Sequence, residues 1–168
     1  MPQALKTFVR AIDAFNRGLG RITMYLIFVM MGILLWSSFS KTFLLPSLWT
    51  LEMAQFTMTA YYLIGGPYAL QAGAHVRMDL FYGNWSDRQK AFADALTVAC
   101  LFFYLGVLLY GGIESTIYAL KYAERSYSAW RPYMSPIKII MCIGIFLMLL
   151  QSLAVFLKDI AKLRGEEL

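Results

Sequence analysis

Long apolar stretches alternate with short polar segments along the chain. Four stretches, residues 22–40, 53–74, 95–113 and 139–157, contain no Lys, Arg, Asp or Glu. A helix needs about 20 mostly apolar residues to cross the hydrocarbon core of a bilayer. Backbone in lipid must satisfy its own hydrogen bonds, and these runs lack the alternation of barrel strands. The pattern predicts an all-α integral membrane protein, a single domain over 1–168, with four transmembrane helices at about 21–42, 50–74, 88–113 and 134–158.

The segment before the first apolar stretch has a different pattern. Its apolar residues recur at helical spacing, and they are Leu5, Phe8, Val9, Ile12, Phe15 and Leu19. Charged residues, among them Asp13, occupy the other side of the same helix. This arrangement predicts an N-terminal amphipathic interfacial helix at about 4–19, with Gly18 and Gly20 permitting the turn into the first span. A signal peptide fits poorly, because the charged region and the apolar run are both too long.

The third apolar stretch is preceded by a helix-start signal and followed by a polar continuation. Ser86 and Gln89 have the spacing of a capping box. The helical pattern continues beyond residue 113 to about Tyr127, and it carries Glu114 and Arg125. We therefore expect a helical extension that projects from the membrane on the periplasmic side. Pro132 and Pro136 should break the chain before the last span.

A Gly65-Gly66-Pro67 run interrupts the second apolar stretch. Proline removes a backbone donor and clashes one turn back, so a kink is expected near Leu63. Broken helices line substrate sites in some transporters, where a matching break occurs in a repeated half. No matching break or internal repeat is evident in this sequence, which favours a packing kink.

Composition and charge agree with the membrane class and orient the chain. Hydrophobic residues make up 60% of the chain and charged residues 15%, with a mean hydropathy of +0.57. Of the 15 Lys and Arg residues, ten fall in the N-terminal segment, the connection after span two and the C-terminal tail. The positive-inside rule puts both termini in the cytoplasm. The basic residues are dispersed between apolar runs, which argues against nucleic-acid binding.

Few residues are suited to catalysis or cofactor binding. The chain has one histidine, His75, and two cysteines, Cys100 and Cys142, which form no C-x-x-C motif. A membrane haem anchor needs two axial ligands, and a zinc or redox site needs closely spaced cysteines. Asp79 lies near His75 in the sequence, but no serine is marked as a nucleophile. We expect no cofactor, no metal and no enzymatic activity.

Five ionisable residues remain as structural candidates. His75, Arg77 and Asp79 alternate after span two, either as a water-facing interfacial loop or as a hydrogen-bonded knot at the helix end. Glu52 and Glu114 lie at the outer ends of spans two and three. Each is either solvated at the interface or paired with a basic residue of a partner subunit. The span centres lack ionisable residues, which a coupled carrier usually places there, so the chain is better interpreted as a subunit.

Several of these features occur together in one known family. The chain has Leu51-Glu52 at the start of span two, then Gly65-Gly66-Pro67-Tyr68-Ala69, and then Gly73-Ala74-His75-Val76-Arg77-Met78-Asp79. Trp130-Arg131-Pro132 precedes the last span. The chain resembles the small membrane subunit, DctQ-like, of tripartite ATP-independent periplasmic (TRAP) transporters, over nearly its whole length.

The resemblance implies a sodium-coupled transporter of the bacterial inner membrane. A periplasmic binding protein, DctP-like, would capture a small organic anion, and a large DctM-like subunit would carry it by an elevator motion. The small subunit would hold the scaffold of the large one and help dock the binding protein. No substrate-binding residue carries over to this chain. A self-sufficient homodimeric carrier is the alternative, but it would need a mid-membrane carboxylate.

From these arguments we take two sets of candidate residues. The candidates for structural or subunit contacts are Glu52, Pro67, His75, Arg77, Asp79 and Glu114. The candidates for docking on the periplasmic side are Arg125 and Arg131.

Overall fold

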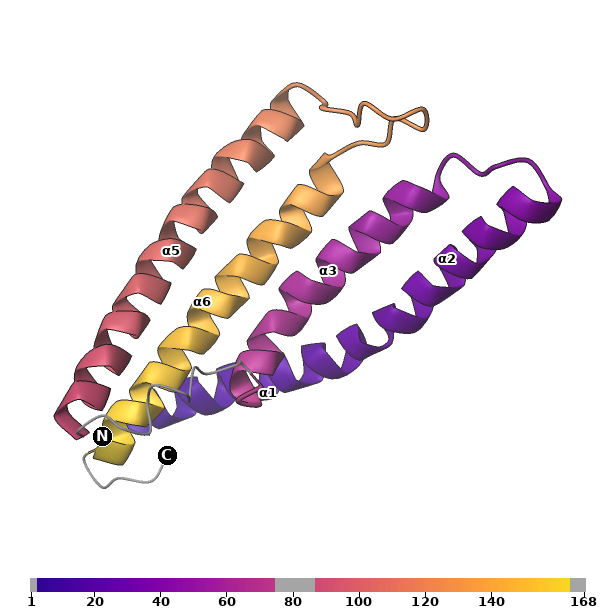
Figure 1. The fold of residues 1–168 in the computed structure, drawn as a ribbon. Coiled ribbons are helices and arrows are strands. Elements are labelled where there is room, and N and C mark those ends of the chain that lie inside the picture. The colour runs from indigo at the N-terminus through magenta and orange to yellow at the C-terminus, as the bar shows by residue number, and fades with distance from the viewer. Residues whose placement is uncertain (1–2, 75–86, 164–168) are drawn as a thin grey trace.

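The computed structural model describes residues 3–74 and 87–163, and these form five helices (Figure 1). The helices are α1 (Gln3–Met24), α2 (Leu26–Phe43), α3 (Thr50–Gln71), α5 (Asp87–Lys121) and α6 (Ser135–Leu163). Within the described ranges, the single β-bridge joins Arg125 and Tyr133 in the connection between α5 and α6. The prediction of an all-helical chain is confirmed.

The helices form a layer rather than a closed bundle. In Figure 1, α5, α6, α3 and α2 lie side by side in that order, and α1 crosses the ends of α6 and α3. The turns from α2 to α3 and from α5 to α6 lie at one end, which we call the loop end. The start of α1 and the finish of α6 lie at the opposite end, which we call the α1 end.

Among the residues that the structure describes, three helical stretches are long and apolar enough to cross a membrane, namely Lys6–Phe43, Thr97–Lys121 and Ser135–Lys158. The first of these covers α1 and α2 together. Helix α3 is not among them, although its 22 residues would extend about 33 Å. It carries Glu52, Gln55 and Gln71 and lies between α2 and α6, so neighbouring helices flank it on both sides (Figure 1). The fourth span therefore remains a prediction.

The break between the first two helices lies at Tyr25, not at the glycines. Helix α1 continues through Gly18 and Gly20 to Met24, and the Tyr25 N–H donates to the Ile22 carbonyl at 3.0 Å. Gly20 instead permits close packing, since a Cβ added there would lie 2.4 Å from Cγ of Tyr68 on α3. The expected turn at Gly18 and Gly20 was wrong, because both residues lie inside α1 and Gly20 serves a contact with α3.

The expected extension of the third span to Tyr127 was also wrong, because α5 ends at Lys121. Ala123 adopts a left-handed conformation with φ of 48°, and the Glu124 N–H donates to the Ala119 carbonyl. A left-handed residue with this type of bond is a common helix ending. The chain then folds back through the bridge between Arg125 and Tyr133.

A close backbone contact joins α3 to α6. Helix α3 runs without interruption from Thr50 to Gln71 through the buried Pro67. Because proline has no N–H, the Leu63 carbonyl one turn earlier receives no helical hydrogen bond. Gly144 of α6 lies against this carbonyl, and a Cβ added at Gly144 would be 2.8 Å from the Leu63 oxygen.

Candidate functional site

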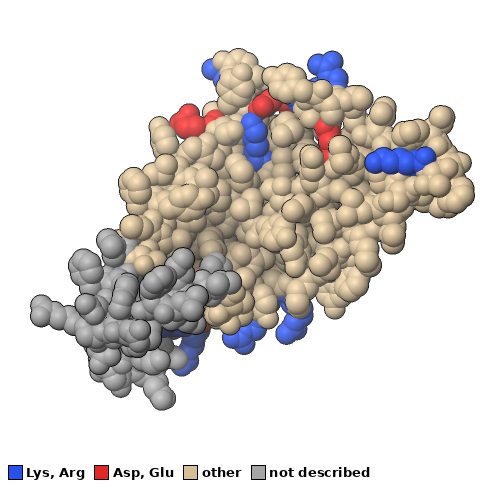
Figure 2. Space-filling model, in the orientation of Figure 1, with Lys and Arg blue, Asp and Glu red and all other residues tan. Residues whose placement is uncertain are grey.

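Polar groups of the described residues gather at both ends of the layer. Figure 2 shows acidic and basic side chains at the loop end, basic side chains at the opposite end, and an uncharged band between them. This distribution is expected of helices that cross hydrocarbon. The ion pair between Glu124 and Lys138 lies at the loop end, and the ion pair between Asp13 and Lys158 lies at the α1 end.

At the loop end, a buried carboxylate joins α3 to the connection between α5 and α6. Glu52 in the first turn of α3 is only 6% exposed. Ser126 donates to its Oε1 at 2.5 Å, although the two residues are 74 positions apart. The other oxygen, Oε2, is buried and has no hydrogen-bond partner among the described residues. The Glu52 carboxylate therefore lies inside the chain rather than in solvent.

A network of hydroxyl groups joins α2 to the start of α3 at the same end. Thr50 donates to Ser37 Oγ at 3.1 Å, and Ser47 Oγ lies 3.0 Å from Thr50 Oγ1. Ser40 Oγ in turn lies 3.2 Å from Ser47 Oγ. Thr50, Ser37 and Ser40 are buried, so this network orders the α2–α3 turn without any charge.

The connection between α5 and α6 presents basic and aromatic groups outward. Its residues line a hollow of about 310 Å³. The guanidinium of Arg125 stacks on Tyr133, 4.3 Å from the ring centroid, and donates to its hydroxyl. Arg131 is exposed with φ of 49°, and no described residue accepts a hydrogen bond from its guanidinium. Glu124 forms an ion pair with Lys138 that fixes the connection to α6.

A second polar cluster lies at the α1 end, and we call it the inner knot. Gln151 of α6 is fully buried, accepts from Asn16 Nδ2 at 2.6 Å and donates to Asp13 Oδ1 at 3.0 Å. Lys158 forms an ion pair with Asp13 through its other oxygen. Gln71 of α3 donates to the Asp13 carbonyl at 3.2 Å. The inner knot therefore connects α1, α3 and α6 through these five residues.

The sequence pattern did not identify the inner knot. Asp13 was expected on the charged, water-facing side of the first helix, but it faces α6. The available signals were two amides, Gln151 inside the uncharged stretch 139–157 and Asn16 on the first helix. Both are buried in the structure, with exposed fractions of 0% and 2%. Buried polar side chains need partners, so each of them pointed to a partner on another helix.

The sequence-predicted candidates are distributed as follows. Glu52 of α3 and Arg125 of the α5–α6 connection lie close together, since Glu52 accepts a hydrogen bond from Ser126, the neighbour of Arg125. Pro67 is buried within α3. Glu114 is exposed on α5 and has no hydrogen bond or ion pair to any described residue.

The three remaining candidates, His75, Arg77 and Asp79, lie outside the described residues. The described residues bring together no group of three His, Cys, Asp or Glu side chains that could hold a metal ion. What the clusters can do chemically is hold helices together by hydrogen bonds and ion pairs.

Comparison with known proteins gives one match. A family model described as "Tripartite ATP-independent periplasmic transporters, DctQ component" matches residues 15–162. No curated protein and no solved structure matches the chain.

Proposed function

The chain belongs to the DctQ component family of tripartite ATP-independent periplasmic transporters, and from this premise we propose that it scaffolds a large elevator-type subunit. The family makes the chain a small membrane component of such a transporter. Sodium-coupled import of a small organic anion is the process in which we place it. We propose a DctM-like subunit and a periplasmic DctP-like protein as its partners.

The observation that carries the scaffold role is a thin layer of helices joined at both ends. The inner knot fixes α1, α3 and α6, and the Glu52–Ser126 bond fixes α3 to the opposite connection. Between them, Gly144 packs against the Leu63 carbonyl. Interiors packed this closely transmit strain rather than deform. A moving transport domain needs such a fixed counterpart.

We propose that the chain crosses the bacterial inner membrane four times, with both termini in the cytoplasm. Helix α3, which lies between α2 and α6, is the fourth span. Exposed Arg10, Arg17 and Arg21 of α1 lie at the end where the first and last helices meet. The positive-inside rule places this end in the cytoplasm. Helix α1 then lies in the interface, with exposed Phe8 and Phe15 in lipid.

Co-expression with the large subunit tests the proposed function. We expect the tagged chain to retain that subunit in detergent through affinity purification and size exclusion. Vesicles containing both subunits should take up the organic anion only when the binding protein and a sodium gradient are present. A chain that forms a homo-oligomer and transports alone would refute the proposal and establish the homodimeric carrier.

If the periplasmic binding protein docks at the connection between α5 and α6, reversing the charge of Arg131 should weaken its association with the transporter. The variant Arg131→Glu should raise the binding-protein concentration for half-maximal uptake roughly 3- to 10-fold, because a rim charge mainly alters association with a complementary surface. The effect should diminish at high salt. Lys41→Glu is the control, since Lys41 is also exposed and lies in the last turn of α2. Equal effects from both variants, or no change, would contradict docking at Arg131.

A further inference from the structure

We propose that one face of α5, the α5 seam, receives a transmembrane helix of the large subunit that places a basic residue opposite Glu114. The α5 seam consists of Tyr104, Val107, Gly111, Glu114 and Tyr118. This inference rests on the proposed function and adds the surface at which the two membrane subunits meet.

The five residues of the α5 seam form one straight stripe. Their spacings of three, four, three and four residues are those of helix–helix contacts along a single face. The stripe covers 14 residue steps, or about 21 Å, which is most of a hydrocarbon core. All five residues are exposed, with Tyr104 at 61% and Val107 at 57%. No described helix packs over this face.

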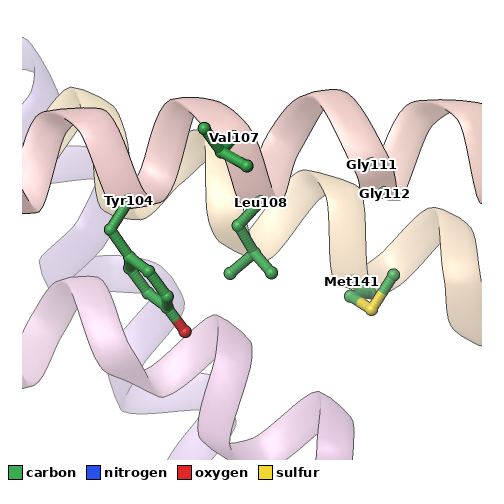
Figure 3. A pocket seen from close by; sticks show the side chains of 6 residues that line it. All are labelled: Tyr104, Val107, Leu108, Gly111, Gly112 and Met141. Atoms are coloured by element: carbon green, nitrogen blue, oxygen red, sulfur yellow. The ribbon is translucent and has the colours of Figure 1, made fainter.

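The middle of the stripe is hollow. A Cβ added at Gly111 would meet nothing within 4 Å. The hollow has a volume of about 320 Å³, and it is lined by Tyr104, Val107, Leu108, Gly111, Gly112 and Met141. Figure 3 shows Tyr104 and Leu108 projecting from α5 and Met141 from α6 around the side-chain-free Gly111 and Gly112. Helices in lipid associate where small residues allow their backbones to approach closely.

Glu114 lies at membrane depth. Its neighbours on α5, Gly112 and Thr116, both face Cys142 of α6, and Thr116 Oγ1 is 3.2 Å from the Cys142 sulfur. Cys142 belongs to the uncharged stretch 139–157. The exposed Glu114 carboxylate therefore sits beside apolar helix, inside the stretch Thr97–Lys121 that is apolar enough to span. Intramembrane carboxylates are costly unless they are paired.

This chemistry favours a protein over lipid as the occupant. Lipid tails offer no partner to the Glu114 carboxylate or to the exposed hydroxyl of Tyr104, and no described residue bonds either group. A basic side chain on the arriving helix would pair with Glu114. A second copy of this chain fits poorly, because a two-fold axis normal to the membrane would bring Glu114 against Glu114.

Photocrosslinking in the co-expressed complex tests this surface. A benzophenone amino acid in place of Val107 should form an adduct with the large subunit. The same residue in place of Ile113, which is exposed on another side of α5 about 9 Å further along the helix, should give at least five-fold less adduct. An adduct with a second copy of this chain, or with lipid alone, would overturn the inference.

Filling the hollow provides the matched test. The variant Gly111→Leu should reduce the large subunit retained on the tagged chain at least 10-fold, and Glu114→Lys should do the same. Gly106→Leu should keep retention within two-fold, because Gly106 is equally open but lies on another side of α5. Each variant alone should elute as the wild-type chain does. If the wild-type chain retains the large subunit and Gly111→Leu does too, this inference fails; if the wild-type chain retains none, the proposed function fails.

Discussion

Replacing Gly144 with alanine should push α6 away from α3 and destabilise the purified chain in detergent. The added Cβ would lie 2.8 Å from the Leu63 oxygen and 2.9 Å from its carbonyl carbon. Backbone cannot rotate aside as a flexible side chain can, so the helices must separate. Overpacking of this kind costs about 1–3 kcal/mol, which corresponds to a fall of roughly 3–10 °C in thermal midpoint for a chain of this size.

Gly32→Ala on α2 is the matched control for this variant. A Cβ at Gly32 would meet nothing within 4 Å. Alanine is also the better helix former by about 1 kcal/mol, so the midpoint should stay or rise. The measurement is thermal unfolding followed by fluorescence-detected size exclusion. If the two variants shift the midpoint equally, the contact between Gly144 and Leu63 does not hold the layer together.

Replacing Gln151 with leucine should release α1 from the rest of the layer. The change leaves Asn16 Nδ2 and Asp13 Oδ1 without their shared partner, and Asn16 is 2% exposed. Each buried polar group left unsatisfied costs about 1–3 kcal/mol. We expect a lower thermal midpoint together with faster proteolysis or hydrogen exchange within α1. Ser152→Ala is the control, since Ser152 bonds the Leu149 carbonyl of its own helix and no other described residue.

A double-mutant cycle separates this hydrogen bond from a general packing effect. Asn16→Leu and Gln151→Leu each leave a polar group behind, whereas the double variant removes both partners. Residues in one network show coupling energies of about 0.5–3 kcal/mol, so the double variant should be more stable than the sum of the single losses. Strict additivity would show that Asn16 and Gln151 act independently.

The apolar runs predicted the helices well because their period and length depend on local sequence. Helix ends depended on single backbone conformations that the pattern does not encode. The predicted extension to Tyr127 looked helical by composition, but Ala123 takes a left-handed φ and ends α5 at Lys121. Likewise, Gly18 and Gly20 look like hinge residues until Tyr68 is seen packed against Gly20.

The contacts between helices were harder to predict than the helices themselves. Glu52 was singled out from its position at a helix start, but its partner Ser126 lies 74 residues away and has no distinctive surroundings in the sequence. Asp13 was predicted to lie on the charged side of the first helix, facing water. A helical pattern distinguishes the polar side from the apolar side, but it does not show which polar residue contacts a neighbouring helix. Only the arrangement of α1 across α6 brings Asp13 to Gln151 and Lys158.

The inner knot also bears on the order in which the chain folds. Helix α1 is synthesised before α6, so Asp13 and Asn16 cannot bond Gln151, which follows 135 residues after Asn16, until α6 has been made. Contacts of such long sequence separation form late, because the chain must lose the conformational entropy of closing a long loop before the contact can stabilise it. Helix α1 can pack against α3 earlier, through Gly20 and Tyr68, but its hydrogen bonds and ion pair to α6 cannot form until α6 has been made. The inner knot is therefore complete only after α6 has joined the layer.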